Sequence, residues 1–117
     1  MCYHSRVIEI RQYVDRLGRT PFLKWLDALG DEAQARVARS LERLELGNLS
    51  SIKSVGAGVQ ELRIDYGPGY RIYFGWDGES LVILLAGGTK KRQQADIERA
   101  RELWQEFKER KREGTWR

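Results

Sequence analysis

Arg63, Asp65, Arg71 and Tyr73 are polar residues in a stretch where polar and apolar positions alternate. Alternation with a period of two is typical of β-strands, and the turn residues between the two runs predict an antiparallel hairpin. In the pairing that we predict, Arg71 faces Asp65 and Arg63 faces Tyr73, so both guanidinium groups leave the same sheet face. Two such groups can bind a phosphate through paired hydrogen bonds, with the phenol beside it. Alternatively, Arg71 and Asp65 form an ordinary cross-strand ion pair and Tyr73 shields the sheet.

A second group of cations follows the last predicted strand. Residues 86–89, with the sequence AGGT, lead into Lys90, Lys91 and Arg92. A flexible glycine turn followed by clustered positive charge suits the rim of a phosphate-binding site. The segment lacks the GxxxxGK[ST] spacing of a nucleotide-binding P-loop, so the glycine pair alone does not indicate a nucleotide site.

The elements that must position these groups begin with three antiparallel strands between Gln60 and Leu85. The sequence Gly-Pro-Gly at 67–69 predicts the first reversal and Asp-Gly at 77–78 the second. On the first two strands, alternate positions form one apolar face made of Leu62, Ile64, Ile72 and Phe74.

The third of these strands is apolar on both sides. With a two-residue loop at 77–78, Leu81 pairs with Phe74 and Ile83 with Ile72, which places Val82 and Leu84 on the face that carries the arginines. A strand that is apolar on both faces is typical of a sheet interior. We therefore expect a further strand, formed by the apolar residues of positions 7–14, to cover its free edge.

Helices are predicted on either side of the sheet sequence. Thr20-Pro21 begins a short helix in which threonine can cap the first amides, and a second helix runs from Asp31-Glu32 to Gly47-Asn48. The segment from Leu49 to Gly58 is predicted to be a loop, in which Lys53 is either a solvated linker lysine or a phosphate contact. A closing helix begins at Gln93, and its apolar stripe consists of Ile97, Ala100, Leu103, Trp104 and Phe107.

This order predicts a small α+β domain spanning residues 1–117. The elements follow as strand, two helices forming a hairpin, three strands and a C-terminal helix, with an antiparallel-dominated sheet of about four strands. Residues 108–117 read as a basic, fraying tail. A chain of 117 residues has room for one hydrophobic core.

Charge and composition limit the partners. The net charge of +4 arises after the sheet, because residues 90–117 contain 10 basic and 6 acidic side chains. This excess predicts a polyanion or an acidic protein as partner, although an ion-paired, solvated helix face would have the same composition. Cys2 is the only cysteine and His4 the only histidine, which argues against a metal site. No apolar run approaches a membrane span or a signal peptide, so we expect a cytoplasmic protein.

The order of elements and three sequence segments resemble the RelE/ParE superfamily of toxins from type II toxin-antitoxin systems, and within it the HigB-like branch of addiction module killer proteins. The resemblance covers residues 7–108. It is carried by ELRIDYGPGYRIYF at 61–74, VILLAGGTKKRQQADI at 82–97 and WQEFK at 104–108. The LRxDYGPGYRxY pattern is the specific part.

The resemblance implies a RelE-like fold and an activity. Members of this kind bind messenger RNA in the A site of the 70S ribosome and cut it without a metal or another cofactor. They are neutralised by a separately encoded antitoxin, commonly a helix-turn-helix protein in this branch. Other members inhibit DNA gyrase, so a gyrase inhibitor is the first alternative function. A non-catalytic RNA-binding or regulatory module on the same fold is the second.

The resemblance also assigns residues. Arg71 matches the arginine of the GYR motif, and Lys90, Lys91 and Arg92 match the basic residues that follow the last strand. They are expected to stabilise the transition state, with one of them as a possible acid. Arg63 joins them through the predicted strand pairing and not through the resemblance, and Lys53 stays a linker lysine or a phosphate contact. Tyr66 and Tyr73 are candidates for base stacking or proton transfer.

The general base stays open. Some relatives have histidines in the site, whereas His4 here precedes the first predicted strand. Asp65, a tyrosine or a lysine with a lowered pKa remain as candidates. Because tyrosine and lysine normally titrate about three units from neutrality, we expect slow cleavage unless the ribosome positions the RNA.

Overall fold

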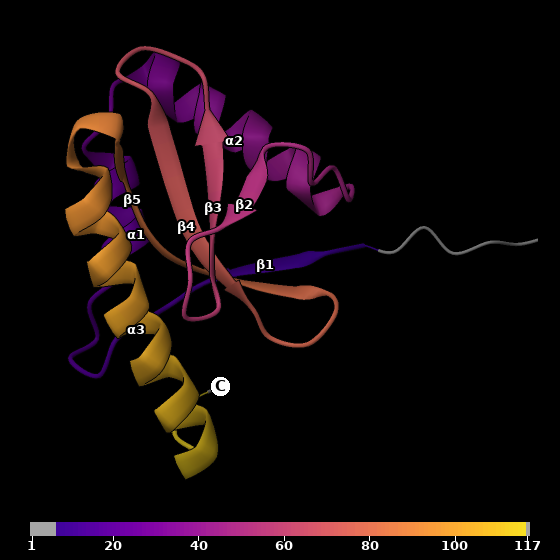
Figure 1. Ribbon diagram of the computed structural model, residues 1–117, viewed down its shortest axis with the longest axis vertical. Coiled ribbons are helices and arrows are strands. Elements are labelled where there is room, and N and C mark those ends of the chain that lie inside the picture. The colour runs from indigo at the N-terminus through magenta and orange to yellow at the C-terminus, as the bar shows by residue number, and fades with distance from the viewer. Residues whose placement is uncertain (1–6, 117) are drawn as a thin grey trace, which may run out of the picture.

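The computed structural model describes residues 7–116, and His4 and Cys2 lie outside the described residues. Five strands form one mixed sheet in the order β1-β5-β4-β3-β2, accompanied by three α-helices (Figure 1). The elements in chain order are β1 (Glu9–Gln12), α1 (Pro21–Asp27), α2 (Asp31–Glu45), β2 (Ile52–Ser54), β3 (Val59–Ile64), β4 (Tyr70–Trp76), β5 (Leu81–Thr89), the 3₁₀ helix η1 (Lys90–Arg92) and α3 (Gln93–Glu113). This arrangement confirms the predicted α+β class.

The N-terminal strand occupies the edge that the sequence predicted. β1 pairs with β5 in parallel, and Glu9 lies opposite Leu81. The other pairs in the sheet are antiparallel. One strand was not expected: β2 lies within the segment 49–58 that reads as a loop, and its three residues pair with the first half of β3. Lys53 therefore lies on an edge strand and not in a linker.

The first hairpin has a longer connection than the Gly-Pro-Gly turn suggested. Residues 65–69 lie outside both strands, and the register pairs Ile64 with Tyr70 and Arg63 with Arg71. The predicted pairs of Arg71 with Asp65 and of Arg63 with Tyr73 are therefore wrong by two residues, because Arg71 pairs with Arg63 and Tyr73 with Glu61. The assignment of faces is unaffected, because a shift of two residues along a strand returns to the same side of the sheet. Gly67 and Gly69 have positive φ angles of 55° and 78°, which lets the loop reverse without steric cost.

The second hairpin corrects the face assignment of β5. Its connection spans residues 77–80, and Val82 lies opposite Trp76 and Leu84 opposite Phe74. Val82 and Leu84 therefore lie on the face of Phe74, and Ile83 lies on the opposite face, which reverses the prediction. A register shift opposite Tyr73 and Phe74 marks a β-bulge.

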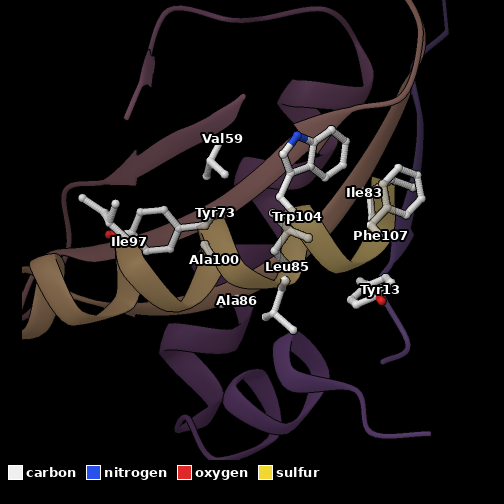
Figure 2. Packing of buried hydrophobic residues seen from close by; sticks show 11 residues of the cluster. Tyr13, Val59, Tyr73, Ile83, Leu85, Ala86, Ile97, Ala100, Trp104 and Phe107 are labelled. Atoms are coloured by element: carbon white, nitrogen blue, oxygen red, sulfur yellow. The ribbon is translucent and has the colours of Figure 1, made fainter. Parts of the chain in front are cut away.

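The two sheet faces carry two hydrophobic clusters. α3 covers one face, where Trp104 and Phe107 stack with their ring centroids 4.8 Å apart (Figure 2). The other face packs against α1 and α2 through Phe22 and Val37. Figure 1 shows α3, in orange to yellow, beside the strands, while α2 lies near β3 and β2. The predicted stripe of α3 is buried along its whole length, which confirms it.

The helices begin and end close to the predicted positions. α1 starts at Pro21, although the Thr20 side chain makes no capping hydrogen bond. α3 continues to Glu113, so most of the expected fraying tail is helical. Arg110 donates a hydrogen bond of 2.6 Å to the Val14 carbonyl, and the Trp116 ring lies 5.1 Å from the Tyr13 ring. Among the described residues, no helix is long and apolar enough to cross a membrane.

Candidate functional site

Two arginines lie side by side on the same sheet face as α3, in the polar part of that face that α3 does not cover. Arg63 of β3 and Arg71 of β4 are direct cross-strand neighbours, and Arg71 lies opposite Gly88 of β5. Like charges that face each other across a strand pair repel. Their carboxylate partners differ: Arg63 lies 3.6 Å from Asp65, whereas Arg71 lies 4.0 Å from Glu61.

Arg71 is a buried guanidinium with an unused donor. Only 6% of the residue is exposed, and Nη1 donates a 2.8 Å hydrogen bond to the Gly69 carbonyl. Its Nε is buried and has no hydrogen-bond partner among the described residues. Buried donors normally find an acceptor, and an unpaired one costs stability. The Nε faces Glu61 Oε2 at 4.0 Å, so its nearest countercharge is this buried carboxylate.

Glu61 is the buried centre of the polar cluster, with 1% of the residue exposed. Its Oε2 accepts hydrogen bonds from the Tyr73 hydroxyl at 3.0 Å and from Gln93 Nε2 at 2.8 Å. Its Oε1 lies 3.8 Å from Lys53 Nζ. Buried carboxylates are retained where cations and donors surround them, as they do here. Glu61 thus connects β2, β3, β4 and the start of α3.

Tyr73 is part of the core and not of the pocket surface. The residue is fully buried among the side chains of the α3 cluster (Figure 2). Burial, reinforced by the charge of Glu61 and the hydrogen bond to it, raises the pKa of the Tyr73 phenol. The hydroxyl is therefore a neutral donor to Glu61 at physiological pH. The predicted pairing of Tyr73 with Arg63 is wrong, because Tyr73 lies opposite Glu61, two residues from Arg63.

The loop between β3 and β4 holds the next two predicted residues. The side chain of Asp65 is 85% exposed and pairs with Arg63, not with Arg71. Tyr66 stacks against Tyr70 with a centroid distance of 6.4 Å, and the Arg36 guanidinium lies 4.4 Å above its ring. Its ring is therefore held between a neighbouring aromatic side chain and a cation from α2.

An open pocket brings several of the predicted residues together. It has a volume of about 460 Å³ and is lined by Arg63, Asp65, Tyr66, Gly67, Pro68, Gly69, Arg71 and Lys90. We call this the Arg71 pocket. Gly69 fastens its rim, because its carbonyl accepts hydrogen bonds from both Arg71 and the Lys90 amide. Lys53 and Glu61 line a neighbouring cavity of about 160 Å³, which shares Arg63 with the Arg71 pocket.

The three cations that follow β5 differ in whether they line the Arg71 pocket. Lys90, Lys91 and Arg92 form η1 and are exposed, but among them Lys90 alone lines the Arg71 pocket. The two preceding glycines do not form a flexible rim, because both lie within β5. A Cβ on Gly87 would come within 2.1 Å of the Trp25 ring, so the absence of a side chain there permits close packing.

Asp96 is a half-buried carboxylate near this end of the sheet. It lies in the first turn of α3, and its Oδ2 is buried without a hydrogen-bond partner among the described residues. Burial raises the pKa of Asp96, while the charge of Arg92 opposes the shift. No group of three or more potential metal ligands occurs within residues 7–116.

The cluster combines properties needed to hold a phosphate ester. A buried guanidinium with an unused donor, an adjacent lysine and a second arginine provide positive charge, and Asp65 provides an exposed carboxylate. The sequence interpretation missed Glu61. The available signal was its position two residues before Arg63, on the polar face of a strand, because a carboxylate there must lie next to cations from the neighbouring strand.

Comparisons with known proteins give the chain a family. The family profile described as "Phage derived protein Gp49-like (DUF891)" matches residues 24–108. An uncharacterized protein of Haemophilus influenzae is 46% identical over 87 residues, which cover 74% of this chain and 88% of that protein. The matched segment contains the whole Arg71 pocket. The chain therefore belongs to the Gp49-like family of phage-derived proteins.

Proposed function

We propose that the protein is the toxin of a type II toxin-antitoxin system and that it cleaves messenger RNA on the ribosome without a metal ion. The observation that carries the proposal is the position of Arg71, a buried guanidinium paired with Glu61, in a pocket that Lys90 and Arg63 also line. The family supports it, because Gp49-like proteins are associated with toxin-antitoxin systems and are related to toxins of the RelE/HigB type.

The pocket residues suit a cleavage in which the RNA supplies its own nucleophile. The 2′-hydroxyl transfers its proton to the exposed carboxylate of Asp65, and its oxygen attacks the adjacent phosphorus. Arg71 and Arg63 stabilise the extra negative charge of the phosphorane. The bond to the 5′-oxygen breaks, Lys90 donates a proton to that oxygen, and a 2′,3′-cyclic phosphate remains.

Glu61 and Tyr73 act indirectly in this scheme. Both are buried, and neither lines the Arg71 pocket. Glu61 positions the Arg71 guanidinium by its charge, and the neutral Tyr73 phenol holds Glu61 by a hydrogen bond. Lys53, Lys91 and Arg92 are exposed around the site and are assigned to the RNA backbone. Tyr66 is the candidate for stacking on a base, which would take the place of the Arg36 guanidinium over its ring.

The ribosome is the proposed source of substrate positioning. The Arg71 pocket is open to solvent, so it cannot by itself hold a flexible strand with the 2′-oxygen in line with the scissile bond. A messenger held in the ribosomal A site is already ordered. The reaction would take place in the cytoplasm, and a cognate antitoxin, proposed to be a helix-turn-helix protein, would cover the cationic surface between rounds of activation.

Induced expression in a bacterial host tests the proposal. We expect wild-type protein to arrest growth and primer extension to reveal cuts inside translated regions. Arg71→Ala should lower cleavage by about 10²–10³-fold, the usual cost of losing a donor to a developing oxyanion. Arg99→Ala is a matched control, because Arg99 is an exposed arginine on α3 that forms a loose 3.9 Å ion pair with Glu102.

Two outcomes would replace the proposal. Growth arrest that survives Arg71→Ala together with a loss of DNA supercoiling would indicate gyrase inhibition. A wild-type protein that binds RNA but neither cuts it nor slows growth without its partner would indicate a non-catalytic RNA-binding module.

A further inference from the structure

Three arginines of α2 form a groove beside the Arg71 pocket. Arg36, Arg39 and Arg43 recur at spacings of three and four, which places them on one helix face. Together with Arg63 of β3 they line a cavity of about 320 Å³ between α2 and the end of β3. We call it the arginine groove.

The positive charge of the arginine groove is weakly compensated. Arg36 lies 3.8 Å from Glu32, a solvent-exposed pair of the kind that contributes little. Neither Arg39 nor Arg43 has a side-chain hydrogen bond or an ion pair with a described residue. Neighbouring like charges on one helix face destabilise the helix, so an anionic ligand would lower the free energy of this surface.

The remaining lining is polar. It consists of the hydroxyls of Ser40, Ser50 and Ser51, the amide of Asn48, and Asp65 and Tyr66, while Leu62 and Ile64 are buried beneath. Interfaces with protein segments usually have apolar or aromatic anchors at their centre. Guanidinium forks surrounded by hydroxyl and amide groups match phosphate oxygens instead.

The arginine groove is continuous with the Arg71 pocket. Arg63, Asp65 and Tyr66 line both cavities, and Arg36 from the groove lies over the Tyr66 ring. A strand with a phosphate at Arg71 can therefore place its neighbouring phosphates along α2, with Arg36 and the Tyr66 ring between the two cavities.

We infer that the arginine groove binds the phosphate backbone of the same RNA strand whose scissile phosphate lies in the Arg71 pocket. This inference rests on the proposed function and extends it, because it assigns a second binding region outside the cleavage site. Its contacts are to phosphates, so they should strengthen binding without selecting a sequence.

Fluorescence anisotropy with fully 2′-O-methylated RNA tests the inference, because such RNA lacks the nucleophile and stays intact. The full chain is titrated at several salt concentrations with a short strand that spans the Arg71 pocket alone and with a strand of about 12 nucleotides. The groove variant carries Arg36→Gln, Arg39→Gln and Arg43→Gln. The control carries Arg99→Gln, Lys108→Gln and Arg112→Gln, which remove the same charge from exposed positions of α3.

For the long strand, we expect the groove variant to weaken binding about tenfold or more. The slope of log affinity against log salt should become shallower by about two, since each phosphate contact contributes about 0.7 for single strands. The short strand should bind the groove variant and the wild type with equal affinity. The control variant should change the affinity for the long strand and the salt slope by less than the groove variant does. Thermal melts of all three proteins verify the fold.

The outcomes separate this inference from the proposed function. Equal weakening by the groove and control variants would overturn the groove while leaving the Arg71 pocket intact. If the groove variant bound RNA normally but no longer bound the cognate antitoxin, the arginine groove would be a protein-binding surface. A wild-type protein that binds neither strand at low salt would overturn both.

Discussion

The Tyr73 hydroxyl donates a 3.0 Å hydrogen bond to Glu61, and these two residues are direct partners across β3 and β4. Because Gln93 donates to the same oxygen, the carboxylate is fixed from the sheet and from α3 at once. The buried Glu61 in turn lies 4.0 Å from Arg71 Nε. The orientation of the pocket guanidinium thus depends on residues that do not line the pocket.

Glu61→Gln should weaken both the fold and the site. Glutamine can still accept from Tyr73 and Gln93, but it leaves buried Arg71 without a countercharge, so the free energy of unfolding should fall by about 1–3 kcal/mol. Urea denaturation measures the change. Asp65→Asn is the matched control, because its carboxylate is exposed, and should shift stability by no more than about 0.5 kcal/mol. Equal losses in the two variants would contradict the role given to Glu61.

Asp96→Asn should raise the melting temperature at neutral pH. Burial raises the pKa of Asp96, so the folded state favours the protonated carboxyl. The stability from this preference is fully present below the unfolded pKa of about 3.9 and is lost as the pH rises through the higher folded pKa. Asparagine removes that loss at neutral pH and should have little effect in acid. Calorimetry at both pH values measures it, and equal shifts would disprove the assignment.

The raised pKa of Tyr13 should make the stability of the protein fall in alkali. Its burial, helped by the hydrogen bond to Glu106, raises its pKa to about 12. Between about pH 10 and 12 the unfolded chain therefore binds fewer protons than the folded one, and stability falls as the pH rises. Tyr13→Phe should make this fall less steep in urea titrations. Tyr66→Phe, in the partly exposed loop, should leave the slope close to that of the wild type.

Gly87→Ala should destabilise the sheet by about 1–3 kcal/mol, the usual range for an overpacked site. The added Cβ would lie 2.1 Å from the Trp25 ring, which α1 holds against β5. Gly30→Ala is the matched control, because no atom outside its immediate neighbours lies within 4 Å of the new Cβ. Its cost should be about 0.5 kcal/mol, from the loss of a favourable N-cap. Denaturant midpoints compare the two.

The sequence predicted those parts of the fold that depend on local patterns. Alternation identified β3, β4 and β5, and helical spacing identified the buried stripe of α3. The doubly apolar β5 also indicated that a further strand had to cover its edge. These patterns arise because one face or both must be buried, whatever the connections are.

Connections and register depend on tertiary contacts that the pattern does not contain. The loop at 65–69 is two residues longer than the Gly-Pro-Gly motif suggested. In the second hairpin, five residues separate the paired Trp76 and Val82, three more than the Asp-Gly turn predicted. An odd difference in register exchanges the two faces of a strand, which is why Ile83 and Leu84 were assigned to the wrong sides. β2 was missed because three residues on a sheet edge have too short a pattern.

In the candidate site, too, the residues set by local patterns were predicted and those set by tertiary contacts were not. Arg63, Arg71 and Lys90 were predicted and line one pocket. Tyr73 was predicted to contact the substrate but is buried, because the register places it opposite Glu61. Glu61 was missed because its importance comes from that pairing and from Gln93, a residue 32 positions later in the chain.

The parallel pairing of β1 with β5 has a consequence for the order of translation. Glu9 lies opposite Leu81, a separation of 72 positions (81 minus 9). In a nascent chain, β1 therefore stays unpaired until most of the domain has left the exit tunnel. Contacts between such distant segments form slowly. Lys90 emerges later still. The Arg71 pocket, which Lys90 helps to line, can therefore be complete only after the codons for β5 have been translated.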